Sequence, residues 1–361
     1  MSAAIVAGRA PNTDPQHASG ARIRARFMHR PAADILLALA WVPFAIVCRG
    51  LETGADGNGL ALFISGVFLL SFAHQPLTVA LVYGDADQFR LKKAIFTWSP
   101  VIFVLAVVAG YYVSFVLVAV VGGLWNAEHT LMQRYGVTRI YGRMAGQDDG
   151  GVEKAMLFSW LVAALLWAAA DRATPDRIAR VSFGENNRVA LEVLTQYRSV
   201  AAVLVWPALT AVAFLVALWV RNELGRPQLN PAKWIYLGST AVLFGLMLVD
   251  PLAGIMGYVG AHALEYFVIV YQSLGRRYGA PDAVDRAPIG RAVRARSGRF
   301  GFMAIYVGIV IGIISVLERL GSPLAYSIVF FTLGGLHVFY DGFIWKLRRP
   351  AVARSLAIDA S

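Results

Sequence analysis

Long runs of apolar residues, broken by short polar stretches, dominate this chain of 361 residues. A helix needs about 20 predominantly apolar residues to cross the hydrocarbon core of a bilayer, and runs of about that length recur about ten times. The pattern therefore predicts an all-α fold, a polytopic transmembrane helical bundle. The predicted spans are residues 32–50, 59–83, 94–110, 111–135, 153–170, 199–220, 233–250, 251–274, 300–318 and 323–345.

The composition agrees with a membrane protein. Hydrophobic residues make up 58% of the chain and charged residues only 15%, which leaves few charges to solvate a globular surface. Cys48 is the only cysteine, so an intrachain disulfide and a thiolate metal cluster are both excluded. The abundance of alanine, glycine and arginine favours a multi-pass protein of a bacterial cytoplasmic (inner) membrane.

The positive charge follows the predicted topology. The net charge is +11, and basic residues gather in alternate connections between spans. The connection 276–299 alone contains seven arginines. Because cytoplasmic connections are enriched in Lys and Arg, this pattern predicts that both termini are cytoplasmic, and it needs no nucleic acid as a partner.

The domain organisation that we predict has three parts. Residues 1–31 form a polar, basic lead that is expected to be disordered and cytoplasmic, residues 32–349 a single transmembrane helical domain, and residues 350–361 a cytoplasmic tail. One interpretation of the spacing is a duplication, with halves 32–135 and 233–345 on either side of the fifth and sixth spans.

Four histidines stand out because they lie inside apolar spans: His74, His129, His262 and His337. All four lie on even-numbered spans, so their helices run in the same direction. With a rise of about 1.5 Å per residue, they are expected to share one slab in the inner half of the bilayer. An imidazole at this depth is costly unless it is paired, protonated or ligated, so we predict a shared metal site.

Two carboxylates follow these histidines at helical spacing. Glu265 lies three residues after His262, and Asp341 lies four residues after His337. Residues three or four apart share one face of a helix, so each carboxylate is expected to point where its histidine points. The predicted metal ligands are therefore His74, His129, His262, Glu265, His337 and Asp341.

Three further residues are candidates for catalysis. Gln133 lies four residues after His129 and on its face, whereas Glu128 is adjacent and is directed about 100° away on the helix. Tyr340 precedes Asp341 within the last span and belongs to a set of aromatic residues that could line an apolar tunnel. We predict catalytic roles for Glu128, Gln133 and Tyr340.

The ligand types restrict the chemistry. Nitrogen and oxygen ligands without thiolate suit non-haem iron, mononuclear or dinuclear, and also manganese or zinc. Our leading hypothesis is an oxygenase, hydroxylase or desaturase that acts on a lipid or isoprenoid and receives electrons from a partner protein or a quinone. The alternatives are an oxidoreductase with haem b held by two histidines, and a proton- or cation-coupled transporter. A zinc hydrolase and a purely structural role are weaker alternatives.

Overall fold

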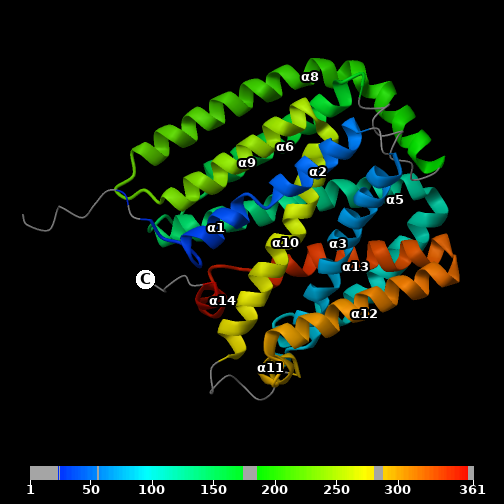
Figure 1. The fold of residues 1–361 in the computed structure, drawn as a ribbon, viewed down its shortest axis with the longest axis vertical. Coiled ribbons are helices and arrows are strands. Elements are labelled where there is room, and N and C mark those ends of the chain that lie inside the picture. The colour runs from blue at the N-terminus through cyan, green and yellow to red at the C-terminus, as the bar shows by residue number, and fades with distance from the viewer. Residues whose placement is uncertain (1–22, 24, 55–56, 174–184, 280–287, 357–361) are drawn as a thin grey trace, which may run out of the picture.

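The computed structural model describes residues 23, 25–54, 57–173, 185–279 and 288–356, and in this part of the chain almost every element is a helix (Figure 1). An apolar bilayer offers the backbone no hydrogen-bond partners, and a helix satisfies its N–H and C=O groups internally. Nine of the described helices are long and apolar enough to cross a membrane. The predicted all-α polytopic bundle is confirmed.

The longer elements coincide with the predicted spans. The first span is divided between α1 (Pro31–Ala38) and α2 (Trp41–Thr53), and three short helices lie between or after the spans, α4 (Ala86–Arg90), α11 (Pro288–Arg294) and α14 (Pro350–Ser355). The others are α3 (Gly57–Tyr83), α5 (Lys93–Met144), α6 (Gly151–Ala170), α8 (Glu185–Leu224), α9 (Pro231–Val249), α10 (Pro251–Tyr278), α12 (Gly298–Leu320) and α13 (Pro323–Ile344).

Helix α5 contains two of the predicted spans, 94–110 and 111–135. Ser114 has an extended backbone (φ −167°, ψ 108°), and the chain reverses direction there. The rings of Phe103 and Trp125 consequently lie 6.0 Å apart, whereas a straight helix would separate these residues by roughly 33 Å. The two predicted spans are thus the two limbs of one bent helix, which is why ten spans appear as nine long helices.

Helix α10 is the most buried of these nine helices. It crosses the middle of the bundle, while α8 and α12 lie on opposite sides (Figure 1). Gly257 and Gly260 let α10 approach α2 closely, because a Cβ atom at Gly257 would lie 3.1 Å from the Trp41 carbonyl oxygen and one at Gly260 2.6 Å from the Phe44 ring. Small residues commonly allow such contacts between membrane helices.

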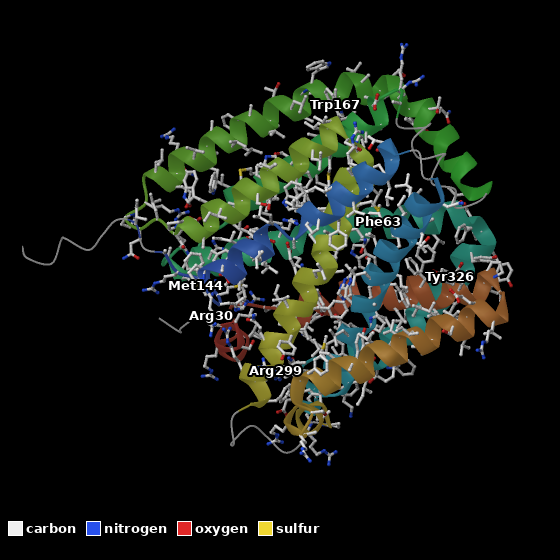
Figure 2. The ribbon with its side chains drawn as sticks, viewed as in Figure 1. Arg30, Phe63, Met144, Trp167, Arg299 and Tyr326 are labelled. Carbon is white, nitrogen blue, oxygen red and sulfur yellow. The ribbon has the colours of Figure 1, made fainter. Side chains whose placement is uncertain are left out.

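The end of the bundle that carries Arg30 and Arg299 (Figure 2), which we call the basic end, is more ordered than the sequence predicts. Figure 2 shows Arg30 and Arg299 toward this end and Tyr326 toward the other. Part of the predicted disordered lead packs here, since Met28 is buried and the Arg26 backbone N–H donates to Asn230 Oδ1 at 3.1 Å. Residues 1–22 and 24 of that lead lie outside the described residues. In the predicted tail, α14 packs against α10.

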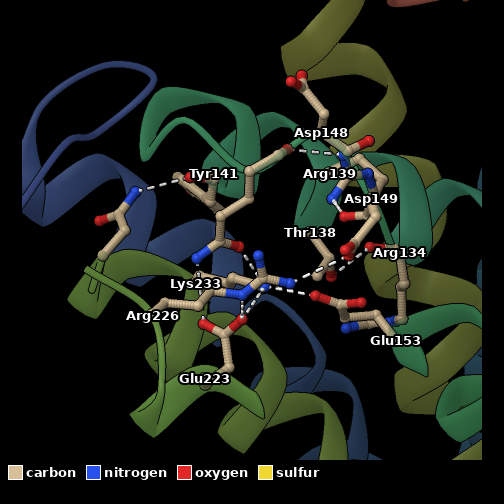
Figure 3. A network of polar contacts seen from close by, with 12 residues as sticks. Arg134, Thr138, Arg139, Tyr141, Asp148, Asp149, Glu153, Glu223, Arg226 and Lys233 are labelled. Atoms are coloured by element: carbon tan, nitrogen blue, oxygen red, sulfur yellow. Dashed lines mark hydrogen bonds and ion pairs between the residues drawn. The ribbon is translucent and has the colours of Figure 1, made fainter. Parts of the chain in front are cut away.

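A buried set of charges joins α6, α8 and α9 to the segment that follows α5 (Figure 3). The Lys233 ammonium contacts Glu153 Oε1 at 2.5 Å, Glu223 Oε1 at 2.8 Å and Gln147 Oε1 at 2.7 Å. Arg226 Nε donates to the same Glu223 oxygen at 2.8 Å. We call these five residues the Lys233 network, and in it each charge has a partner of opposite sign.

Candidate metal centre

The four histidines of α3, α5, α10 and α13 meet at one buried place. The His74 ring lies 4.6 Å from the rings of both His262 and His337, measured between centroids. The His129 ring lies 5.2 Å and 4.5 Å from the same two rings, so the four imidazoles form a closed cycle of contacts. None is more than 6% exposed. This meeting depends on how the four helices pack against one another, which equal depth along the sequence does not determine.

Several imidazole nitrogens in this cluster lack an ordinary partner. Within the described residues, neither ring nitrogen of His262 has a hydrogen-bond partner, and His129 Nε2 has none either. His74 Nε2 and His337 Nε2 are 3.1 Å apart. A buried polar atom without a partner costs about 1–3 kcal/mol, so this concentration of imidazoles favours a ligand that accepts nitrogen lone pairs.

Hydrogen bonds connect Thr78 with His337 and Asp341. The Thr78 hydroxyl donates to Asp341 Oδ1 at 2.9 Å and lies 2.7 Å from His337 Nδ1. In the tautomer of His337 that is protonated at Nδ1, this atom donates to Thr78 Oγ1, and Nε2 carries its lone pair toward the other histidines. Metal-bound histidines are commonly oriented through their second nitrogen in this way.

Asp341 presents one oxygen to the histidines. Its Oδ1 accepts hydrogen bonds from Thr78, from the Tyr266 hydroxyl at 3.0 Å and from Trp345 Nε1 at 3.2 Å. Its Oδ2 lies 3.7 Å from His129 Nε2 and 3.9 Å from His337 Nδ1. The carboxylate is therefore held by Oδ1, and Oδ2 is the oxygen that could bind a metal or accept a proton.

Two overlapping groups of residues could hold a metal ion. In the described part of the chain, His74, His262 and His337 form one group, and His129, His337 and Asp341 form the other. In each group the ligand atoms lie within 4.8 Å of one another. Nitrogen ligands with one carboxylate fit a divalent transition metal, and His337 belongs to both groups.

Glu265 lies elsewhere, although it was predicted to be a ligand. Its Oε1 lies 3.3 Å from Arg134 Nη2, while its Oε2 accepts from Gln133 Nε2 at 3.1 Å and from the Tyr236 hydroxyl at 3.0 Å. Glu265 and Arg134 are both buried. The spacing from His262 identified the correct helix, but the charge of Glu265 is already balanced by Arg134. We therefore leave Glu265 out of the ligand set proposed below.

The three predicted catalytic residues have different surroundings. The Tyr340 hydroxyl contacts other residues, since it lies 2.9 Å from that of Tyr83 and 2.8 Å from Ser99 Oγ. Gln133 donates to the His262 carbonyl oxygen at 3.1 Å as well as to Glu265, so it holds α10 against α5. Glu128 is half-buried and belongs to the wall of a cavity beside His129.

This cavity opens beside the histidines and has a volume of about 440 Å³. At one end it reaches His129, Asp341 and Tyr266, a residue that sequence reasoning included only among the aromatic residues. Tyr266 lies four residues after His262, so the same spacing rule could have identified it. The walls are mainly apolar and comprise Trp125, Glu128, His129, Met132, Gln133, Tyr135, Gly136, Val137, Arg139, Ile140, Tyr266, Ile269, Val338, Asp341, Gly342, Trp345, Lys346, Leu347 and Leu356.

Comparison with known proteins gives a short match. The chain is 34% identical over 106 residues to phosphoethanolamine transferase EptC of Escherichia coli, in strain K12 and in strain O18:K1:H7. The match covers 27% of this chain and 18% of the matching proteins, so the chain spans about a fifth of their length. No family model matches the chain, and no solved structure gives a significant match.

This match changes the predicted chemistry. The matching proteins are named as transferases, and our prediction of an oxygenase, hydroxylase or desaturase is therefore wrong. The comparison supports neither of our alternatives, the haem oxidoreductase and the transporter. The multi-pass membrane character of the chain stands, because it follows from the long apolar helices of the structure.

Proposed function

We propose that this protein is a divalent-metal-dependent membrane enzyme that transfers a group to or from a lipid. The convergence of four buried imidazoles, with unpartnered nitrogens on His262 and His129, carries the proposal. The short match to phosphoethanolamine transferases favours group transfer over oxidation. Zinc is the first metal to test, because imidazole and carboxylate ligands suit it and leave a position open for substrate.

The residues of the site would have different roles in the proposed reaction. His74, His262 and His337 would hold the metal, which supplies a Lewis acid that polarises the bond to be broken. Asp341 Oδ2 lies beside His129 Nε2 and faces the same place, so it can accept the proton of an attacking hydroxyl group. Thr78 and Tyr266 keep that carboxylate in position through Oδ1.

The cavity beside the histidines supports a lipid as the substrate. His129 and Asp341 belong to the wall of the cavity, so a molecule in the cavity contacts the site directly. Most of the other wall residues are apolar, and a volume of about 440 Å³ lies within the range of small-molecule sites. The reacting atom of the lipid would be the one that lies beside His129 and Asp341.

The test begins with metal analysis of the purified full-length chain by mass spectrometry. We expect a stoichiometric divalent metal without a Soret absorption band, and loss of most of that metal in His337→Ala, since this residue belongs to both groups. Glu265→Gln serves as a matched control and should retain the metal. Unchanged metal content in His337→Ala, or a Soret band, would overturn the proposed site.

Group transfer needs its own measurement. The protein is reconstituted in vesicles with a lipid that carries labelled phosphoethanolamine, and movement of the label to another lipid is followed. The expected result is transfer that stops after treatment with a chelator and resumes when metal is restored. Transfer that is unaffected by removal of the bound metal would contradict the proposal.

A further inference from the structure

The wall of the cavity beside the histidines extends along several turns of helix. Along α5 its wall extends from Trp125 to Ile140, which corresponds to roughly 22 Å of helix. The wall continues past the end of α13 to Lys346 and Leu347, and to Leu356 just after α14. The cavity therefore runs from the depth of the histidines to the basic end of the bundle.

Two glycines leave room in this cavity. Gly136 on α5 and Gly342 on α13 both belong to its wall, and a Cβ atom added at either would meet nothing within 4 Å. Neither glycine is thus needed for a close approach between helices, in contrast to Gly257 and Gly260. Their missing side chains enlarge the cavity, so a larger side chain there would fill space without a clash.

The outer end of the cavity is positively charged. Lys346 and Arg139 belong to its wall, and among the described residues neither lies within 4 Å of a carboxylate. The Arg139 guanidinium instead donates to the backbone carbonyl oxygens of Gln147, Asp148 and Asp149, which leave its charge unbalanced. Lys346 Nζ lies 5.4 Å from the centre of the Phe343 ring.

We infer that the cavity binds an amphiphile with an anionic end, whose carboxylate or phosphate lies at Lys346 and whose apolar body extends along α5 toward His129. This inference rests on the proposed function only for what happens at the histidine end. The apolar walls exclude a fully hydrated anion, and the unbalanced cations at the outer end select a negative charge over a neutral polar group.

The experiment uses the full chain in nanodiscs of phosphatidylcholine and two probes, photoactivatable stearic acid and its methyl ester. The acid should crosslink to cavity residues and bind at least about tenfold more tightly than the ester, because a charged hydrogen bond is lost with the carboxylate. Lys346→Gln should remove this preference, whereas Lys346→Arg should keep it. Acetate and inorganic phosphate should not compete, since they lack an apolar body.

The glycines supply the matched control. Gly136→Leu should reduce binding of both probes at least about tenfold by filling the cavity. Gly123→Leu lies on the same helix, also faces open space and lies outside the cavity wall, so it should bind the probes normally. Equal binding of acid and ester by the wild-type chain, or normal binding by Gly136→Leu, would overturn the inference.

Metal content is measured in the same samples. Loss of probe binding with metal retained in Gly136→Leu shows that the cavity acts as a ligand site distinct from the metal ligands. A wild-type chain without metal that still prefers the acid would overturn the proposed function and leave the inference about the cavity intact.

Discussion

Two buried polar clusters in this protein differ in how their groups are paired. In the Lys233 network, the ammonium contacts two carboxylates and one amide oxygen, and Glu223 also pairs with Arg226. In the histidine cluster, both nitrogens of His262 and one of His129 lack a partner within the described residues. Apart from the partly exposed Arg226, the side chains of both clusters are almost inaccessible to solvent.

The difference indicates which cluster needs a ligand. In the Lys233 network each charge has a partner of opposite sign, although Glu153 Oε2 accepts no hydrogen bond from a described residue, and an added ion would disturb this charge balance. Buried bases with open nitrogens lose the hydrogen bonds that water would give them, and a bound ligand would offset this cost. Burial of polar groups is therefore not sufficient to identify a site, and pairing has to be examined for each atom.

The largest expected effect is a loss of stability when the Lys233 network is disrupted. Lys233→Ala leaves Glu153 and Glu223 buried without their cation and should lower the free energy of unfolding by about 3–5 kcal/mol. Thermal or denaturant unfolding in detergent measures this. The folded fraction of Lys233→Ala should bind as much metal as wild type. As a control, Lys154 is exposed, and Lys154→Ala should change the free energy of unfolding by less than about 0.5 kcal/mol. A Lys233→Ala protein of normal stability would contradict the comparison.

A smaller effect is expected at Thr78, whose hydroxyl contacts both His337 and Asp341. Thr78→Val removes the hydroxyl that links His337 to Asp341 and should weaken metal affinity about 10–100-fold, as loss of such outer partners generally does. Metal titration monitored by competition with a chelator gives the value. Thr78→Ser keeps the hydroxyl and should restore most of the affinity. If Thr78→Val binds metal normally, the hydrogen-bond chain does not orient the ligand.

The metal-free histidine cluster should tolerate an apolar replacement. His262→Leu removes two nitrogens that have no partner, so the stability of the metal-free chain should change by less than about 1 kcal/mol. Added metal should raise the unfolding temperature of wild type but not of His262→Leu, since a ligand that binds the folded state stabilises it. A loss as large as that of Lys233→Ala would show that the imidazole has a structural role.

The smallest expected effect lies outside the membrane helices, at His29. Burial lowers the pKa of His29 below its ordinary value of 6.5, and nearby Arg276 lowers it further, although Asp34 opposes both. The folded state therefore favours neutral imidazole. As pH falls below about 6.5, the unfolded chain binds a proton first and stability declines. His29→Gln should flatten this part of the profile of unfolding temperature against pH, and an unchanged profile would contradict the assignment.

The fold was largely predictable because its main determinant is hydrophobic length. All ten predicted spans correspond to helices or helix limbs, and the reversal at Ser114 falls close to the predicted boundary between residues 110 and 111. The packing of Met28 and of α14 was not predicted, since short polar segments carry no comparable periodic signal. Whether the two halves are related by duplication stays a prediction.

The site was predictable only within single helices. Helical spacing identified Asp341 beside His337, because both positions lie on one face of α13. It could not show that Arg134 of α5 would pair with Glu265 of α10, since that contact depends on how two helices pack. Arg134 lies at the end of the predicted span 111–135, and only the structure shows that it is buried. The contacts of Tyr340 with Tyr83 and Ser99 likewise depend on how the helices pack.

The order of the four histidines along the chain has a consequence for biosynthesis. His74 lies on the second predicted span and His337 on the tenth, so the first and last ligands are separated by 263 residues. The cluster cannot be complete until α13 has entered the membrane, whereas the Lys233 network is complete once α9 has done so. Loading of the proposed metal would therefore follow insertion of nearly the whole chain, and a truncated translation product would carry the ionic network without the histidine cluster.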